Sequence, residues 1–328
     1  MRYMARLVWC LLAAVPAISG PAQVQAQEQA FPNKPIRVIV SAAAGGITDI
    51  MARVMQEKLG RGLGQPVIVE NKPGAGGIIA VDYVARSAPD GYTLTIVNVS
   101  NAAIAPWINK NLPYDPLNDF VGVAAVGEAP TIVAINDKVP AKTLKEFIEY
   151  AKANPGKINY GSAGNGTGPH LAAEVLAHLT GIKMVHVPYK GAGPAAVDLA
   201  AGQVQLGMIA IGSAKGQIAA GQVRVLAVAG TRRLAALPDV PTFDQACVSG
   251  YDVTNWFGVL APRGTPRDVV ASLNSHINQV LDDPQVVQRF QDVGTLPIRE
   301  SVQQFHKRII TDHAKWRDIV RIAGIKAQ

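Results

Sequence analysis

The sequence contains little cysteine and few aromatic residues. It has two cysteines in 328 residues, and aromatic side chains make up 6% of the chain. Cys10 lies in an N-terminal segment that we expect to be removed, so Cys247 has no partner for an intramolecular disulfide and is expected to be buried. Basic residues are scattered, without the interleaved aromatic side chains that stack on bases, and we therefore expect no nucleic acid among the partners.

The first residues have the composition of a signal peptide. Arg2 and Arg6 precede an apolar run at residues 7–18, and a stretch of small and polar residues follows as far as Ala26. The apolar run is about a dozen residues long, whereas a membrane-spanning helix needs roughly 20. We expect residues 1–26 to be cleaved after Ala26 and the mature protein to reside in the periplasm.

Short β-branched runs alternate with segments of helical length along the mature chain. Strands are expected at residues 36–40, 67–70 and 93–98, with helices between them at residues 48–59 and 77–87. A second series begins with a helix at residues 144–153. This alternation is typical of α/β proteins whose parallel strands are joined by crossover helices. It predicts two mostly parallel sheets flanked by helices.

Two apolar runs predict strands that connect the two halves. They lie at residues 121–128 and 253–260. We expect domain 1 to comprise residues 27–125 plus 253–328, and domain 2 to comprise residues 126–252. Two crossings predict a ligand cleft with a double-strand hinge, as in proteins that close around a ligand.

A glycine-rich loop at residues 41–49 leaves a predicted strand and enters a predicted helix. Its backbone N–H groups and the positive end of the helix dipole converge where the carboxyl edge of the sheet opens, which favours an anion. The glycines alternatively form only a tight turn, with Thr48 or Asp49 as the N-cap. The charge of Asp49 opposes a bare phosphate, so we expect a carboxylate.

A second loop at residues 161–170 repeats this arrangement in the other half, with Pro169 in the first helical turn. Other segments that follow strands are expected to line the same cleft. The predicted ligand-binding residues are Ser41, Ala42, Ala43, Ala44, Gly45, Gly46, Thr48, Asp49, Ser100, Asn101, Ser162, Asn165, Gly166, Thr167, His170, Tyr189 and Lys190.

Enzyme motifs match the sequence poorly. Residues 191–196 satisfy a relaxed dinucleotide fingerprint, but Pro194 lies inside it and no acidic residue follows about 20 positions later. No phosphate-binding lysine loop occurs, and Ser162 lacks the flanking glycines of a nucleophile elbow. His170, Glu174 and His178 share a helix face, yet they lack the spacing of a zinc motif. We expect no enzyme activity, cofactor or metal.

Short motifs follow one another in order along the mature chain. They are FPNKPI at 31–36, GGITD at 45–49, NKPGAGG at 71–77, LPYDP at 112–116, YGSAG at 160–164, VPYKG at 187–191, LPDVPT at 237–242 and GTP at 264–266. Together they resemble the substrate-binding proteins of tripartite tricarboxylate transporters, the Bug family. The resemblance implies a periplasmic binding protein fold of type II, with the ligand carboxylate held by loop amides, small hydroxyl groups and bridging waters.

The resemblance also implies a function. It predicts a monomeric periplasmic receptor that captures a mono-, di- or tricarboxylate or an acidic amino acid and delivers it to the large and small membrane subunits of the transporter. Two alternatives stay open at this stage: a receptor that presents its ligand to a membrane sensor kinase, and an exported enzyme. The family's first loop usually has Pro and an aromatic residue where this chain has Ser41 to Ala44, so selectivity is expected to differ there.

Overall fold

The structure is a computed structural model, and it describes residues 31–230, 232–325 and 327. The expected signal peptide and its cleavage after Ala26 lie outside the described residues. Within the described part of the chain, no helix is both long and apolar enough to cross a membrane.

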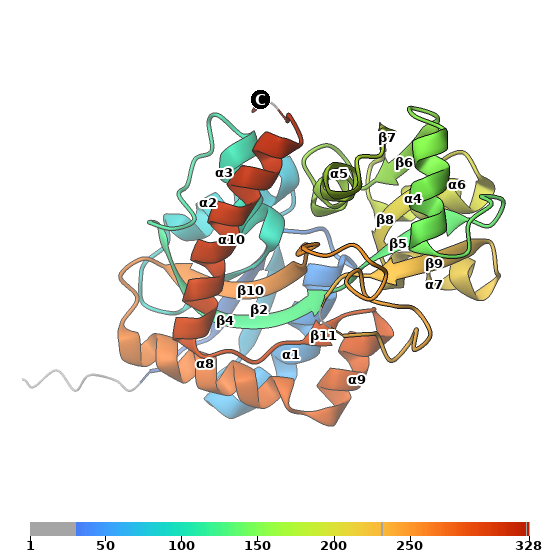
Figure 1. Ribbon diagram of the computed structural model, residues 1–328. Helices are drawn as coiled ribbons and strands as arrows, with labels where there is room; N and C mark the ends of the chain where they lie inside the picture. Colours follow the sequence, from blue (N-terminus) through green and yellow to red (C-terminus); the bar gives the residue numbers. More distant parts are fainter. Residues whose placement is uncertain (1–30, 231, 326, 328) are drawn as a thin grey trace, which may run out of the picture. The chain divides into compact units, whose positions relative to one another are not determined.

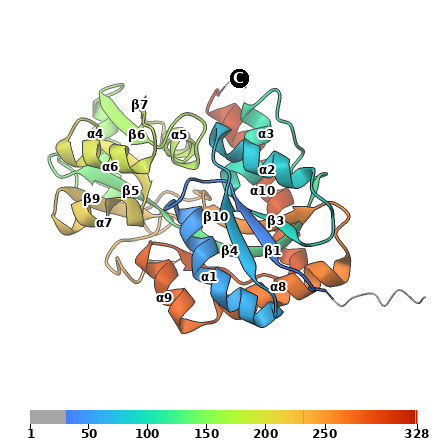
Figure 2. The same cartoon turned by 180° about the vertical axis from the view of Figure 1, so that it is seen from behind.

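Among the described residues, the first sheet has six strands in the order β11-β4-β10-β3-β1-β2 (Figures 1 and 2). Its strands are β1 (Ile36–Val40), β2 (Val67–Asn71), β3 (Thr93–Asn98), β4 (Phe120–Ala129), β10 (Asn255–Pro262) and β11 (Leu296–Pro297). The helical segments associated with it are α1 (Ile47–Leu63), η1 (Ala75–Gly77), α2 (Ile78–Ala85), η2 (Ser100–Ile104), α3 (Ala105–Ile108), α8 (Arg267–Leu281), α9 (Pro284–Asp292) and α10 (Val302–Ile322).

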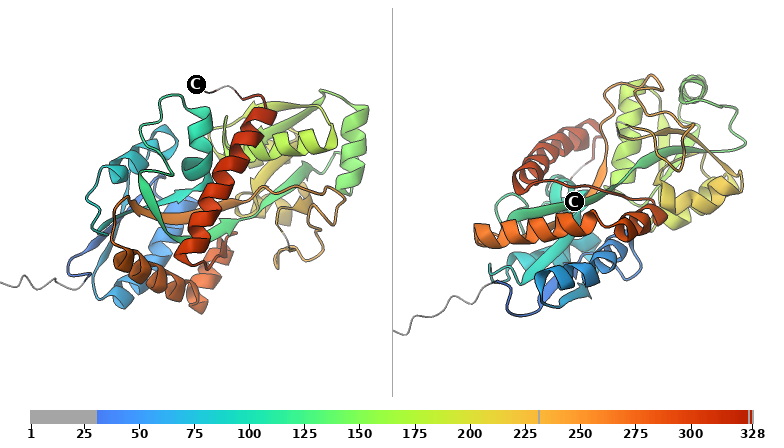
Figure 3. Two further views of the ribbon diagram at one scale, coloured as in Figure 1. Left: turned by 60° about the vertical axis from the view of Figure 1, so that its left-hand side comes forward. Right: turned by 90° about the horizontal axis from the view of Figure 1, so that it is seen from below.

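Alternate residues of β1 face opposite sides of this sheet, because side chains alternate along a strand. Val38 and Val40 belong to an apolar core that includes residues of α1, α8 and α9, whereas Ile39 belongs to the core that includes α2 and α10. The helices therefore cover both faces, and Figure 3 shows α8 in orange and α10 in red on opposite sides of the strands.

The second sheet has five strands in the described residues, in the order β7-β6-β8-β5-β9. Its strands are β5 (Thr131–Asn136), β6 (Ile158–Ser162), β7 (Met184–Pro188), β8 (Leu206–Ala210) and β9 (Val223–Val228). The helices of this half are α4 (Leu144–Ala153), α5 (Gly168–Thr180), α6 (Ala192–Ala201) and α7 (Ile211–Ala219).

Both sheets are mixed, which corrects the expectation of mostly parallel sheets. Strand β1 is parallel to β2 and β3, and β6 is parallel to β7 and β8. Strand β10 is antiparallel to β3 and β4, and β5 is antiparallel to β8 and β9. A helix that connects two consecutive strands of one sheet predicts that those strands are parallel. That reasoning does not apply to β10 or β5, which join their sheets next to strands that are distant in the sequence.

The chain passes between the two sheets twice. Strand β4 continues through Pro130 into β5, and the segment after β9 returns the chain to β10. Cys247 lies on this returning segment. It is exposed and has a positive φ of 65°, so the expectation that it is buried is wrong.

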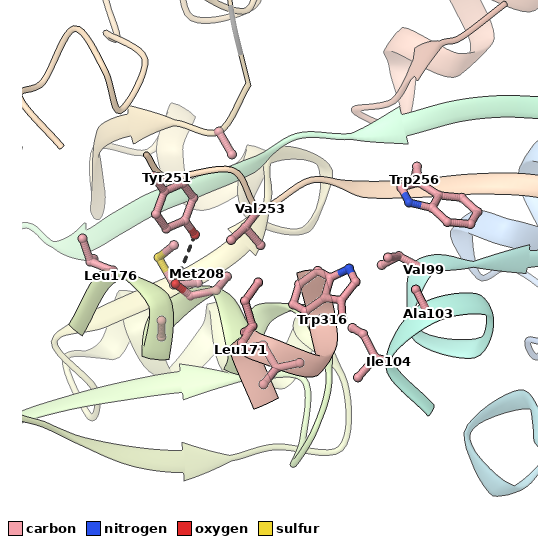
Figure 4. Close-up of a cluster of buried hydrophobic side chains, with 14 of the residues drawn as sticks. Val99, Ala103, Ile104, Leu171, Leu176, Met208, Tyr251, Val253, Trp256 and Trp316 are labelled. Atoms are coloured by element: carbon pink, nitrogen blue, oxygen red, sulfur yellow. Dashed lines mark hydrogen bonds between the residues drawn. The ribbon is translucent and has the colours of Figure 1, made fainter. Parts of the chain in front are cut away.

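One apolar core includes residues from both halves. Trp316 of α10 lies in it with Val99 and Ile104 near η2 and with Leu171 of α5 (Figure 4). The Tyr251 hydroxyl, on the returning segment, donates a hydrogen bond to the carbonyl oxygen of Ala172 in α5 over 3.1 Å. Helix α5 is therefore buried against elements of the first half, which places its N-terminal loop near them.

Candidate ligand-binding site

The loop at residues 41–49 connects β1 to α1, as the sequence predicts. Gly46 is the N-cap residue and has no side chain with which to cap the helix. The first N–H groups of a helix have no partner inside it, so they remain available to an anion at this end of α1. Ala43, Ala44 and Gly45 are exposed, whereas Thr48 is buried.

Asp49 stabilises this loop from within. Its carboxylate accepts hydrogen bonds from Gly45 N at 2.9 Å, from Arg53 Nε at 2.9 Å and from Asn71 Nδ2 at 2.8 Å. Burial would raise the pKa of Asp49, but the bonds from Arg53, Gly45 and Asn71 outweigh burial and hold the pKa below its ordinary value. Asp49 is 2% exposed, and its carboxylate already accepts hydrogen bonds from three groups of the protein. Its role is therefore to shape the loop.

Ser41 and Asn101 come together beneath the first loop. The Ser41 hydroxyl lies 3.3 Å from Asn101 Oδ1, and Asn101 Nδ2 donates to the carbonyl oxygen of Gly76 over 2.7 Å. A Cβ atom at Gly77 would lie 2.8 Å from Asn101 Nδ2, so only glycine fits there. Ser100 is half-buried, and its backbone N–H donates to Asn98 Oδ1. Asn101 is thus a structural link between η1, η2 and the first loop.

The loop at residues 161–167, which we call the second ligand loop, connects β6 to α5. Gly164 and Gly166 adopt positive φ angles of 129° and 69°, which favour glycine. The Thr167 hydroxyl donates to the carbonyl oxygen of Gly164 over 2.7 Å and thus closes the turn. Asn165 is exposed at its tip. Helix α5 begins at Gly168, directly after the loop, and has Pro169 in its first turn. Its N-terminus therefore adjoins this loop, just as the N-terminus of α1 adjoins the first loop.

Two histidine rings lie under the second ligand loop. His170 and His186 stack face to face, with ring centroids 3.8 Å apart and an angle of 7° between the planes. His170 Nδ1 accepts a hydrogen bond from Gly166 N over 3.0 Å, and His186 Nε2 lies 2.7 Å from Ser162 Oγ. Burial, together with the neighbouring His170, lowers the pKa of His186 to about 4. Both rings are therefore neutral near pH 7.

The Ser162–His186 pair has the spacing of a nucleophile and a general base, but its surroundings differ from those of a catalytic pair. Ser162 is completely buried, and its hydroxyl also lies 3.1 Å from both the N–H and the carbonyl oxygen of Gly164. A base with a pKa of about 4 is weak near pH 7. This arrangement suits a structural hydrogen bond.

The remaining predicted site residues lie outside this hydrogen-bond network. The Tyr189 hydroxyl donates to Asp198 of α6 over 2.7 Å, and burial raises its pKa to about 12. Lys190 is exposed. Glu174 accepts a short hydrogen bond from the Tyr160 hydroxyl, while His178 is exposed on the same helix. No group of three or more His, Cys, Asp or Glu side chains in the described residues could hold a metal ion.

The second ligand loop also contacts the first half. A Cβ atom at Gly166 would lie 2.6 Å from Ile108 Cδ1 in α3, the helix that follows Ser100 and Asn101. Ile108 and His186 were not among the predicted site residues. His186 comes directly before the VPYKG motif, and that position was its only signal in the sequence.

Two α/β halves joined by two crossings, each with a glycine loop leading into a helix N-terminus, define a two-domain solute-binding protein. The model of the tripartite tricarboxylate transporter family receptor (TctC) matches residues 51–325. The chain is 36% identical over 320 residues to the protein BugT of Bordetella pertussis, which covers 96% of this chain and 98% of that relative. The chain belongs to the tripartite tricarboxylate transporter receptor family.

Solved structures agree with this assignment. The R. palustris protein Rpa4515 with adipate superposes with a TM-score of 0.80 at 32% identity, over 91% of this chain and 100% of that one. MatC from Rhodopseudomonas palustris with bound malate superposes with a TM-score of 0.75 at 34% identity, over 88% of this chain and 100% of that one. Both are similar to this chain along most of its length.

Proposed function

We propose that this chain is a periplasmic receptor that captures a small organic carboxylate between its two halves and delivers it to the membrane subunits of a tripartite transporter. The observation that carries the proposal is the pair of helix starts, α1 and α5, each entered through a glycine loop at the carboxyl end of a strand. Such N-termini bind anions through backbone N–H groups. Relatives solved with adipate and with malate support the same ligand class.

Neutral donors meet the carboxylate charge in this proposal. Arg53, the cation that contacts the first loop, already binds Asp49 and donates to Asn71 Oδ1 over 2.8 Å. The second ligand loop contains no Lys or Arg. Backbone amides therefore do most of the binding, and the Ala42 to Ala44 segment, in which Ala43 and Ala44 are exposed, determines which ligand shapes fit.

Closure about two connecting strands completes the mechanism. We assign residues 27–125 plus 253–328 to one domain and residues 126–252 to the other, with β4 and β10 as the hinge strands. The ligand shifts the population towards the closed form only by its higher affinity for that form. The Ile108–Gly166 contact, which joins the two halves, forms as the domains close.

Calorimetry with protein freed of any co-purified ligand tests the proposal. We expect binding to at least one member of a panel of mono-, di- and tricarboxylates, and mass spectrometry should recover that ligand unchanged, without turnover. Absence of binding across the panel, or chemical conversion of the ligand, would contradict the proposal.

Two substitutions that each add one negative charge test where the ligand binds. Ala44→Glu adds a carboxylate to the exposed tip of the first loop and should weaken binding at least tenfold through like-charge repulsion. Ala153→Glu adds the same charge at an exposed position of α4 and should leave the affinity unchanged. Equal effects of the two substitutions would place the ligand elsewhere.

A further inference from the structure

The two stacked histidines hold opposite ends of the second ligand loop. His186, on β7, contacts Ser162 where the loop begins, and His170, in the first turn of α5, accepts the N–H of Gly166 near its end. The rings touch each other face to face at 3.8 Å. The stack therefore sets the distance between Ser162 and Gly166, and with it the direction of the amides between them.

The hydrogen bonds define the protonation of this pair. Because His170 Nδ1 accepts from Gly166, the proton of the neutral ring is on Nε2, which lies 4.0 Å from Glu174 Oε1. Ser162 Oγ accepts from Gly164 N, so its own proton goes to the Gly164 carbonyl oxygen or to His186. In either case the hydroxyl both accepts and donates a hydrogen bond within this network.

From this geometry we propose that His186 is a positioning residue for carboxylate binding, which acts through its stack on His170 and its bond to Ser162 to keep the second ligand loop ready for the ligand. The inference rests on the proposed function and deepens it. It assigns to Ser162, which the sequence predicts as a direct ligand contact, a role in shaping the loop.

The stack requires neutral rings. Protonation of His170 would put a proton on Nδ1, facing the N–H of Gly166, and protonation of both rings would bring two positive charges to 3.8 Å. The groups that face the rings are Glu174 on α5 and Tyr160 on β6, whose ring lies 4.9 Å from that of His186. Glu174 is occupied by the Tyr160 hydroxyl.

The sign of the pH effect follows from burial. Burial lowers the pKa of His170 and lowers that of His186 from 6.5 to about 4. Because these pKa values are lower in the folded protein, the unfolded chain is protonated at a higher pH than the folded chain. The histidine stack is therefore fully stable above pH 6.5, and its stability decreases as the pH falls towards 4.

Two substitutions separate the ring from its hydrogen bond. His186→Phe keeps an aromatic face for His170 but cannot bond to Ser162, whereas His186→Gln can bond to Ser162 but has no ring to stack. His178→Gln is the control, because His178 is exposed near the C-terminal end of α5, the helix that contains His170, and lies away from the loop.

Three measurements on the full protein test the proposal. Imidazole nitrogen NMR should show His170 with its proton on Nε2 from pH 5 to 8. The hydrogen-exchange rate of the Gly166 amide should rise about tenfold in His186→Phe and in His186→Gln, as expected for one lost hydrogen bond or stack. The Kd for adipate, which serves as the probe, should rise by the same factor. Both quantities should stay constant in His178→Gln. The adipate affinity of the unmodified protein should decline as the pH falls towards 4.

The outcomes distinguish the two proposals. A proton on Nδ1 of His170, or Gly166 exchange in both His186 variants within twofold of the unmodified protein, would overturn the role of the stack. If the stack and exchange results hold but adipate and the other carboxylates do not bind the unmodified protein, the proposed function fails while the positioning of the loop by His186 is supported.

Discussion

Asn71 donates one hydrogen bond to Asp49 Oδ1 over 2.8 Å and another to the carbonyl oxygen of Ala42 over 3.0 Å. The end of β2 therefore holds both the beginning of the first loop and the first turn of α1. Arg53 and Gly45 complete the contacts of the same carboxylate. The shape of the first loop thus depends on one buried charge, which can be tested by pH and by substitution.

We predict that Asp49→Asn lowers the free energy of unfolding by about 1–3 kcal/mol at pH 7, because charge-assisted hydrogen bonds to Arg53 and Asn71 are weakened. The pKa of Asp49 is lowered in the folded protein, so its contribution is present above the unfolded value of 3.8 and is lost as the pH falls below it. Urea unfolding between pH 7 and pH 3 measures both effects.

Other carboxylates also titrate between pH 7 and pH 3. The quantity to compare is therefore the difference in the free energy of unfolding between the unmodified protein and Asp49→Asn. The stability gap between the unmodified protein and Asp49→Asn should narrow below pH 4. A gap that stays constant down to pH 3 would show that the Asp49 charge does not stabilise the loop. Asp268→Asn in the first turn of α8, at an exposed position, serves as the control.

Local patterns in the sequence predicted local structure well. The expected strand at residues 93–98 and the helix at residues 144–153 have the bounds of β3 and α4. Helix α4 also has a local N-cap, since Thr143 Oγ1 accepts from Glu146 N, and the Glu146 carboxylate accepts from Lys142 N. These features depend on residues within four positions of one another, so short-range patterns contain the information.

The parts that the sequence did not predict depend on distant residues. His186 reaches the second ligand loop because β7 pairs with β6 in a register that sets His186 opposite Tyr160. Nothing near His186 in the sequence specifies that register. The two glycine loops were predictable because each lies at a strand-to-helix junction, but the use of Asp49 and Ser162 inside the loops follows only from their contacts.

Gly212 and Gly294 bring the two halves into backbone contact. A Cβ atom at Gly212 would lie 2.5 Å from the carbonyl oxygen of Val293, and one at Gly294 would lie 2.7 Å from Gly212 N. We predict that Gly212→Ala destabilises this contact by about 1–3 kcal/mol, because backbone atoms cannot move aside as a side chain can. Small-angle X-ray scattering should show a shift towards a more open form.

Gly216→Ala is the matched control in the same helix. A Cβ atom at Gly216 meets nothing within 4 Å, and alanine in a helix interior stabilises by roughly 0.5–1 kcal/mol relative to glycine. The two substitutions should therefore change the urea midpoint in opposite directions. If both raise it, the Gly212 contact between the halves is not tight in solution.

Trp256 and Trp316 are both completely buried, yet their indole N–H groups differ. Trp256 Nε1 donates to Asp312 Oδ2 over 2.5 Å, and Asp312 is 5% exposed and also pairs with Lys315. Trp316 Nε1 has no hydrogen-bond partner in the described part of the chain. Trp256→Phe and Trp316→Phe remove a similar side-chain volume, but only Trp256→Phe removes a hydrogen bond.

We therefore predict that Trp256→Phe destabilises the protein by about 1–2 kcal/mol more than Trp316→Phe, because it leaves the buried Asp312 carboxylate with one fewer donor. Urea unfolding followed by far-ultraviolet circular dichroism measures the difference without relying on the tryptophan signal. Equal losses would mean that Trp316 Nε1 acquires a partner in solution, such as a buried water, and a larger loss for Trp316→Phe would contradict the assignment of its N–H as unpaired.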